Sequence, residues 1–145
     1  MITKWDKRFL ELAEVIATWS KDPSTQVGAV IVRPDKTIAS TGYNGFPMGM
    51  PDDPEYLENR EEKYSRVVHG EINAILFARE AVKGYTLYTT PFMPCDRCFV
   101  QVVQAGIKRV VFPVCPREKL VRWKDAFNRV RSFATETGVE LVEVV

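Results

Sequence analysis

The stretch from Val27 to Arg33 constrains the fold more than any other part of the chain, because apolar and β-branched residues fill it almost without interruption. A strand that is apolar on both sides fits a sheet that is covered on both of its faces. A turn at Pro34–Lys36 and a second strand over Thr37–Tyr43 complete a predicted hairpin. The chain therefore needs helices on both sides of a sheet.

Helical and strand patterns alternate around this hairpin. An amphipathic helix is predicted before it, over Thr3–Ser20, and a loop rich in Gly, Pro and Asp follows it, with an exposed helical segment over Pro54–Arg66. The later predicted elements are a helix from Gly70 through Val82 to Lys83–Gly84, a strand Tyr85–Thr90, a helix Cys95–Ala105, a strand Lys108–Phe112, a helix Arg117–Thr137 and a strand Val139–Val145. This order predicts an α/β fold, a three-layer α/β/α sandwich around a five-stranded mixed sheet, in a single domain over residues 1–145.

The composition argues against some classes of binding partner. The 145 residues carry a net charge of +1, which gives no large basic field for nucleic acid or an acidic membrane. Three cysteines are too few for a disulfide scaffold and favour a reducing, cytoplasmic setting. The N-terminal residues lack the apolar core of a signal peptide, and no apolar run approaches the ~20 residues that span a bilayer. We therefore expect a cytoplasmic protein without a membrane or nucleic-acid partner.

Two predicted helix starts carry the residues that bind metals. His69 is the only histidine, and Cys95 and Cys98 stand three positions apart, so that both sulfur atoms lie on one face of a helix. The positive end of the helix dipole favours the thiolate form that binds metal. Together the three residues offer one nitrogen and two sulfur ligands, where a structural zinc site has four protein ligands. Three ligands and one open position are typical of a catalytic zinc ion that holds water.

Glu71 lies two residues beyond His69, within reach of such a water without being a ligand. Zinc lowers the pKa of its water from 15.7 to about 7, and a carboxylate can then carry the proton. Hydrolysis at an amidine-type carbon needs both a hydroxide and a proton for the departing amine. We therefore predict Glu71 as the catalytic proton carrier.

Other interpretations of these residues remain open. A Cys-x-x-Cys pair can be a redox motif or half of a structural zinc site, and Cys115 could close such a site as a fourth ligand. Cys115 has no ligand-like spacing and fits a buried, small apolar residue better. The chain could also be a non-catalytic zinc module, although a purely structural site has no need for Glu71.

The signature His-x-Glu followed by Pro-Cys-x-x-Cys is that of zinc-dependent nucleobase deaminases. Four further blocks, at residues 21–29, 41–49, 52–53 and 104–108, occur in the order found in deoxycytidylate (dCMP) deaminases. The chain resembles this family from about Trp5 to Phe112. The resemblance implies hydrolytic deamination of dCMP to dUMP and ammonia, in which a zinc-bound hydroxide attacks C4 and Glu71 moves the proton. It also implies one catalytic Zn²⁺ ion held by His69, Cys95 and Cys98.

The resemblance also implies substrate contacts. These are Asn44 at the sugar, Gly70 at the pyrimidine, and Lys21, Ser24 and Gln26 near the phosphate, although Lys21 can equally be a solvated cation at a helix end. Members of the family are usually hexamers that dCTP activates and dTTP inhibits, with Mg²⁺ accompanying the triphosphate. The Gly-Tyr-Asn-Gly loop associated with that regulation is present, which predicts a homo-oligomer with these effectors.

The chain departs from the family pattern at three points. Gly70 replaces the commoner Ala, and the approach to Cys95 is one residue longer, so that Phe92 could shape the base pocket or belong to the core. The altered pocket leaves a 5-modified dCMP possible as the substrate. Two further alternatives to dCMP are dCTP and a tRNA adenosine. The basic residues of the last helix spread around it, which favours a solvated or subunit-facing helix over a surface for tRNA. With its one His and two of its three Cys already used, the chain cannot build the second zinc site that some phage members carry.

Overall fold

The computed structural model describes all residues from 1 to 145 and contains one mixed sheet. The strands are β1 (Gly28–Val32), β2 (Ile38–Tyr43), β3 (Thr86–Thr90), β4 (Arg109–Pro113) and β5 (Glu140–Val144), in the spatial order β2-β1-β3-β4-β5. Strand β1 pairs antiparallel with both β2 and β3, whereas β3 with β4 and β4 with β5 pair in parallel. The predicted five-stranded mixed sheet is confirmed.

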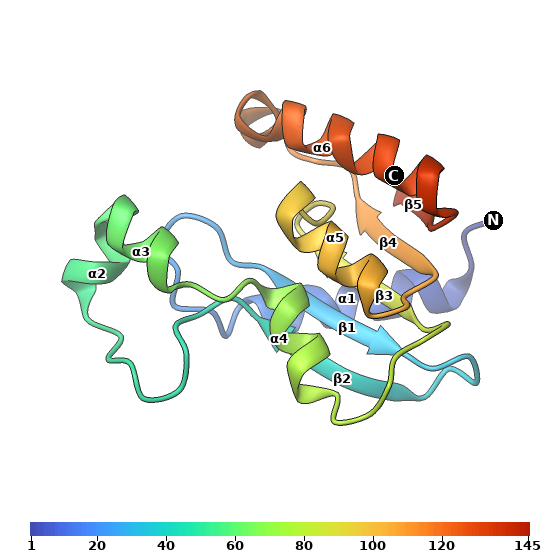
Figure 1. Ribbon diagram of the computed structural model, residues 1–145, viewed down its shortest axis with the longest axis horizontal. Coiled ribbons are helices and arrows are strands. Elements are labelled where there is room, and N and C mark those ends of the chain that lie inside the picture. Colours follow the sequence, from blue (N-terminus) through green and yellow to red (C-terminus); the bar gives the residue numbers. More distant parts are fainter.

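Six helices surround this sheet. They are α1 (Lys4–Ala17), α2 (Pro54–Glu58), α3 (Arg60–Arg66), α4 (Gly70–Phe77), α5 (Asp96–Gln104) and α6 (Arg117–Thr137). Helix α1 covers one face of the sheet, and α4, α5 and α6 lie over the other, which confirms the three layers (Figure 1). Helices α2 and α3 project at the end of the molecule away from both chain termini (Figure 1). No helix combines the length and the apolar character that crossing a membrane requires.

Strand β1 lies at the centre of the fold, and all five of its residues are buried. Val30 and Val32 belong to the cluster under α1, whereas Ala29 and Ile31 belong to the cluster under the other three helices. Successive side chains of a strand point to opposite faces, so an unbroken apolar strand supplies both cores at once. The sequence pattern of this strand is thereby explained.

Asp6 joins α1 to the sheet. It closes a capping box with Thr3 at the start of the helix and is fully buried. Its carboxylate accepts hydrogen bonds from the Tyr88 hydroxyl (2.8 Å) and from two nitrogen atoms of Arg109 (2.8 and 2.9 Å). Burial acts to raise the pKa of Asp6, but the hydrogen bonds outweigh it and hold this pKa well below its ordinary value. The buried group is therefore a charged, fully partnered carboxylate.

One helical prediction was wrong in its extent, and another segment is helical as predicted but divided. The helix expected to run to Lys83–Gly84 ends at Phe77, because Arg79 has a φ of 56° in the left-handed region; Val82 is buried without being helical. The segment over residues 54–66 divides into two helices at Asn59, whose side chain accepts a hydrogen bond from the backbone N–H of Glu62 and caps α3.

Gly42 sets the distance between α4 and strand β2. A Cβ atom at this position would lie 2.4 Å from the backbone nitrogen of Ala74 and 2.5 Å from the carbonyl oxygen of Gly70. Both atoms belong to α4, so only a glycine allows the helix to lie this close to the strand. The start of α4, which follows His69, is thus fixed against the sheet by backbone packing.

Candidate active site

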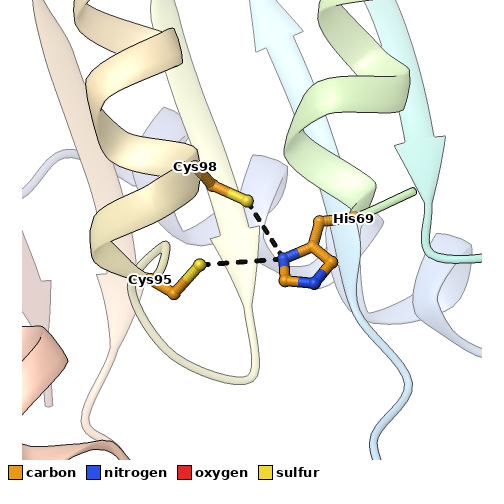
Figure 2. A group of neighbouring side chains, drawn as sticks. All are labelled: His69, Cys95 and Cys98. Atoms are coloured by element: carbon orange, nitrogen blue, oxygen red, sulfur yellow. Dashed lines mark hydrogen bonds between the residues drawn. The ribbon is translucent and has the colours of Figure 1, made fainter. Parts of the chain in front are cut away.

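The predicted metal ligands meet where α4 and α5 begin. Figure 2 shows the side chains of His69, Cys95 and Cys98 pointing toward one another from these two helix starts. The Nδ1 atom of His69 lies 3.0 Å from Sγ of Cys98 and 3.7 Å from Sγ of Cys95. All three ligand atoms lie within 4.8 Å of one another, close enough to bind one ion.

His69 and Cys95 each occupy the N-cap position of their helix. Neither side chain makes a capping hydrogen bond to its helix, so both remain available to a ligand. The free backbone N–H groups at each helix start give this region a positive potential. That potential favours thiolate sulfur and, with it, metal binding.

The three ligand residues shift one another's pKa values through their mutual contacts. The hydrogen bond from the Cys98 thiol, together with His69, holds the pKa of Cys95 below its ordinary value despite its burial. The same contact and burial raise the pKa of Cys98, and the contact with Cys95 raises that of His69. These three side chains share protons among them, and a metal cation that binds them would displace those protons.

The donor set fits zinc. One imidazole nitrogen and two thiolate sulfur atoms are ligands that zinc prefers, and three protein ligands leave one position open. His69 and Cys95 line a cavity, whereas Cys98 is buried behind them. Cys115 does not belong to the ligand group, so the structure does not support a closed site that uses it.

Glu71 lies in the same cavity, in the first turn of α4. Its side chain is buried, and Oε1 accepts a hydrogen bond of 3.1 Å from the Thr89 hydroxyl of β3. Burial raises the pKa of Glu71, outweighing the opposing charge of His69. A carboxyl group with a raised pKa takes up and releases protons more readily near neutral pH, as a general acid and base must.

The cavity has a volume of about 640 Å³, including its open mouth. Its inner wall holds His69, Glu71 and Cys95. The remaining wall comes from five segments: the loop before β1, Asn44 after β2, residues 92–94 after β3, helix α3 with the adjoining Val67, and helix α6. The last two segments were not predicted to contribute to the site.

Three of the predicted substrate residues line the cavity: Ser24, Asn44 and Phe92. The Asn44 amide also holds the loop before β1, because Oδ1 accepts from the Val27 N–H (2.8 Å) and Nδ2 donates to the Thr25 carbonyl (2.9 Å). Phe92 is buried against Trp123 and Phe127 of α6 and therefore belongs both to the wall and to the core.

The other three lie off the cavity wall. Lys21 is exposed and pairs with Asp52 at 2.8 Å on another part of the surface, and the Gln26 amide donates to the Ser20 carbonyl. Gly70 is buried beside Val27, where a Cβ would meet its side chain at 3.1 Å. Substrate contacts by these residues stay predictions.

The cavity also contains residues that the sequence did not single out. Lys63 and Tyr64 come from α3, and Arg122 and Trp123 come from α6. No local motif marks them, because they are separated by more than fifty residues and meet only in the fold. The segment over residues 54–66 was predicted to be exposed, and the last helix to be solvated or subunit-facing.

Comparison with known proteins gives the class of this chain. The family model described as the cytidine and deoxycytidylate deaminase zinc-binding region matches residues 3–114. The chain therefore belongs to the cytidine and deoxycytidylate deaminase family. The match ends before α6, so the part of the cavity wall that Arg122 and Trp123 form lies outside it.

Individual relatives agree with this assignment. An uncharacterized deaminase of Aliivibrio fischeri is 42% identical over 141 residues, which cover 97% of this chain and 94% of that protein. The deoxycytidylate deaminase of Mus musculus is 44% identical over 115 residues, which cover 75% of this chain but only 64% of the mouse protein. The deoxycytidylate deaminase of Mycobacterium phage D29 is 36% identical over 75% of this chain and 94% of its own length.

Solved structures share the fold. A dCMP deaminase of cyanophage S-TIM5, in complex with dCMP and dUMP, superposes with a TM-score of 0.76 at 24% identity, covering 99% of each chain. A cytidine deaminase of Mycobacterium tuberculosis superposes with a TM-score of 0.54 at 20% identity, covering 87% of this chain and 96% of that one. The cytidine deaminase-like α/β fold is thus confirmed.

Proposed function

We propose that this chain is a zinc-dependent hydrolase that deaminates dCMP to dUMP and ammonia. The observation that carries the proposal is the convergence of His69, Cys95 and Cys98 within 4.8 Å, with the buried carboxyl group of Glu71 in the same cavity. The three ligands would hold the ion, which supplies Lewis acidity and makes water a nucleophile near neutral pH. The deoxycytidylate deaminases among its relatives support dCMP as the substrate.

The chain's own residues account for the proton transfers. Hydrolysis replaces the exocyclic amine at C4 with the oxygen of water, so a proton must leave the water and reach the departing amine. Glu71 can accept this proton and deliver it, and the Thr89 hydroxyl orients its carboxyl group. The buried position of Glu71 keeps bulk water from competing for the proton.

Ammonia release tests this proposal. We expect zinc-loaded protein to release ammonia from dCMP faster than from deoxycytidine, CMP or dCTP under identical conditions. A 5-methylated dCMP and a tRNA anticodon stem-loop would be run beside them as the alternative substrates. If none of these releases ammonia while zinc is bound, the proposed reaction is wrong.

Regulation and assembly are further parts of the proposal. We infer a cytoplasmic homo-oligomer, a hexamer by resemblance, with dCTP as activator and dTTP as inhibitor and with Mg²⁺ accompanying the triphosphate. The three free thiols agree with a reducing compartment. Light scattering would give the subunit number, and dCMP saturation curves that neither triphosphate changes would remove the effectors.

A further inference from the structure

Cationic side chains surround the part of the cavity formed by α3 and α6. Lys63 of α3 and Arg122 of α6 belong to the cavity wall, and Arg60 acts on Arg122 as a neighbouring like charge. Asp22 is the carboxylate that faces them from the loop before β1. The second carboxylate of the lining, Glu71, lies with the metal ligands at the inner wall, so Lys63 and Arg122 concentrate positive charge at the part of the cavity that α3 and α6 form.

Asp22 is already committed to other partners. Its Oδ1 atom accepts hydrogen bonds from the N–H groups of Ser24 (2.8 Å) and Thr25 (3.1 Å), and Lys63 Nζ lies 3.2 Å away. The side chains of Lys63 and Asp22 are 9% and 10% exposed, so this pair is largely shielded from solvent. Asp22 therefore pairs directly with Lys63, and it makes no hydrogen bond or salt bridge with Arg122 although its charge acts on Arg122.

Arg122 has no partner for its charge within the chain. Its guanidinium makes no hydrogen bond or salt bridge, although an arginine has five N–H donors. The group lies over the rings of Tyr64 (5.3 Å) and Trp123 (5.1 Å), which restrict where it can point. Loss of solvent and then the like charge of Arg60 lower the pKa of Arg122, and together they outweigh the opposite effect of the charge of Asp22.

The position of Arg122 over the cavity is fixed by its helix. Lys119, one turn earlier, donates to the Ser24 carbonyl (3.2 Å) and to the Thr25 hydroxyl (3.0 Å) of the loop before β1. Trp123 packs against Phe92 of the cavity wall, with ring centroids 5.9 Å apart. Contacts of Lys119 and Trp123 thus hold α6 before and after Arg122 in the sequence. The guanidinium therefore needs no large movement to meet a ligand in the cavity.

We infer that Arg122, supported by Lys63, recognises the 5′-phosphate of the substrate and makes this chain a deaminase of nucleotides in preference to nucleosides. This inference rests on the proposed function and deepens it. A phosphate dianion is a bidentate acceptor for a guanidinium and would be the directly bonded anionic partner that Arg122 lacks within the chain. Arg122 takes the place of Lys21 and Gln26 in this role, since these two do not line the cavity.

The test compares binding of the product dUMP with that of deoxyuridine by isothermal titration of the zinc-loaded protein, so that no turnover interferes. We expect Arg122→Gln to weaken dUMP binding by about 10- to 100-fold, the effect of one charge-assisted contact, while deoxyuridine binding stays the same. Arg122→Lys should restore part of the loss because it keeps the charge but not the planar fork. Arg117→Gln is the matched control, an exposed arginine of the same helix that does not line the cavity.

The outcomes separate this inference from the proposed function. If wild-type protein binds dUMP and deoxyuridine equally, or if Arg122→Gln weakens both alike, phosphate recognition by Arg122 is wrong even though dCMP is deaminated. A loss in Arg117→Gln as large as in Arg122→Gln would equally overturn it, because the effect would then be one of general charge. Absence of ammonia release from dCMP contradicts the proposed function, whereas the difference in binding between dUMP and deoxyuridine is measured independently of it.

Discussion

Substitution of Gly42 by alanine should weaken zinc binding although Gly42 touches no ligand atom. The added Cβ would lie 2.4 Å from the Ala74 nitrogen, whereas ordinary contacts begin at 3.4 Å, so α4 must move by about 1 Å. His69 immediately precedes this helix and Glu71 lies in its first turn. Metal sites tolerate displacements of only about 0.2 Å in their ligand distances.

We therefore expect Gly42→Ala to lower zinc affinity by about 10- to 100-fold, as the loss of an orienting contact does, and to destabilise the fold by about 1 to 3 kcal/mol. Competition with a chromophoric chelator measures the affinity, and urea unfolding measures the stability. Gly45→Ala is the neutral control, since nothing lies within 4 Å of the added Cβ.

A second control separates displacement of α4 from general loss of stability. Leu10 is buried in the cluster on the opposite face of the sheet, and Leu10→Ala should cost about 2 to 5 kcal/mol. It should leave the zinc affinity of the folded protein unchanged. Zinc binding by Gly42→Ala as tight as in the wild type, or an equal loss of affinity in Leu10→Ala, would refute the argument that backbone packing positions the ligands.

Three other perturbations follow from the same structure. Glu71→Gln should keep zinc and the fold but lower the rate of ammonia release from dCMP by at least about 100-fold, and a variant that still deaminates at the wild-type rate would contradict the role of Glu71. Asp6→Asn should destabilise the protein by about 3 to 5 kcal/mol at pH 7, because it leaves Arg109 without its buried partner. The pKa of Asp6 is depressed in the folded state, so its contribution to the free energy of unfolding is fully present above its unfolded pKa of about 4 and is lost as the pH falls further. The difference in urea unfolding between wild type and Asp6→Asn should therefore shrink below that pH. A difference that grows there would contradict the assignment. Thr90→Val should be neutral or stabilising by about 1 kcal/mol, since the buried Thr90 hydroxyl has no hydrogen-bond partner, and a clear loss of thermal stability would point to a water bound there.

Periodicity was sufficient to predict the parts of the fold with strong local signals. Helix α6 has the predicted bounds, and Gly138 ends it with a φ of 77°, the left-handed conformation that a glycine adopts readily. Helix α4 was predicted too long because Val82 continues the apolar pattern although the chain has left the helix at Arg79. A buried position reveals that a side chain faces the core, not which backbone conformation takes it there.

The residues of the site also divide into those that local motifs predicted and those that only the fold brings together. His69, Glu71, Cys95 and Cys98 lie in short motifs whose spacing carries the chemistry, so the sequence predicted their convergence. Lys63 and Arg122 meet only because α3 and α6 approach one cavity, and that approach depends on tertiary packing around Trp123. The sequence of a mostly charged helix does not indicate which of its cations line a cavity. The pairing of Lys21 with Asp52 likewise depends on the path of a loop.

At the N-cap positions of His69 and Cys95, the residue that binds metal is not one that stabilises the helix start. Neither residue caps its helix, whereas Ser, Thr, Asp or Asn at such a position stabilises a protein by about 1 kcal/mol. Replacing either ligand by one of these residues should therefore yield a protein that is more thermostable than the metal-free wild type but no longer retains metal. Where no metal is bound, selection for stability would favour capping residues at positions 69 and 95, and a descendant of this chain freed from both metal and catalysis would be expected to carry them.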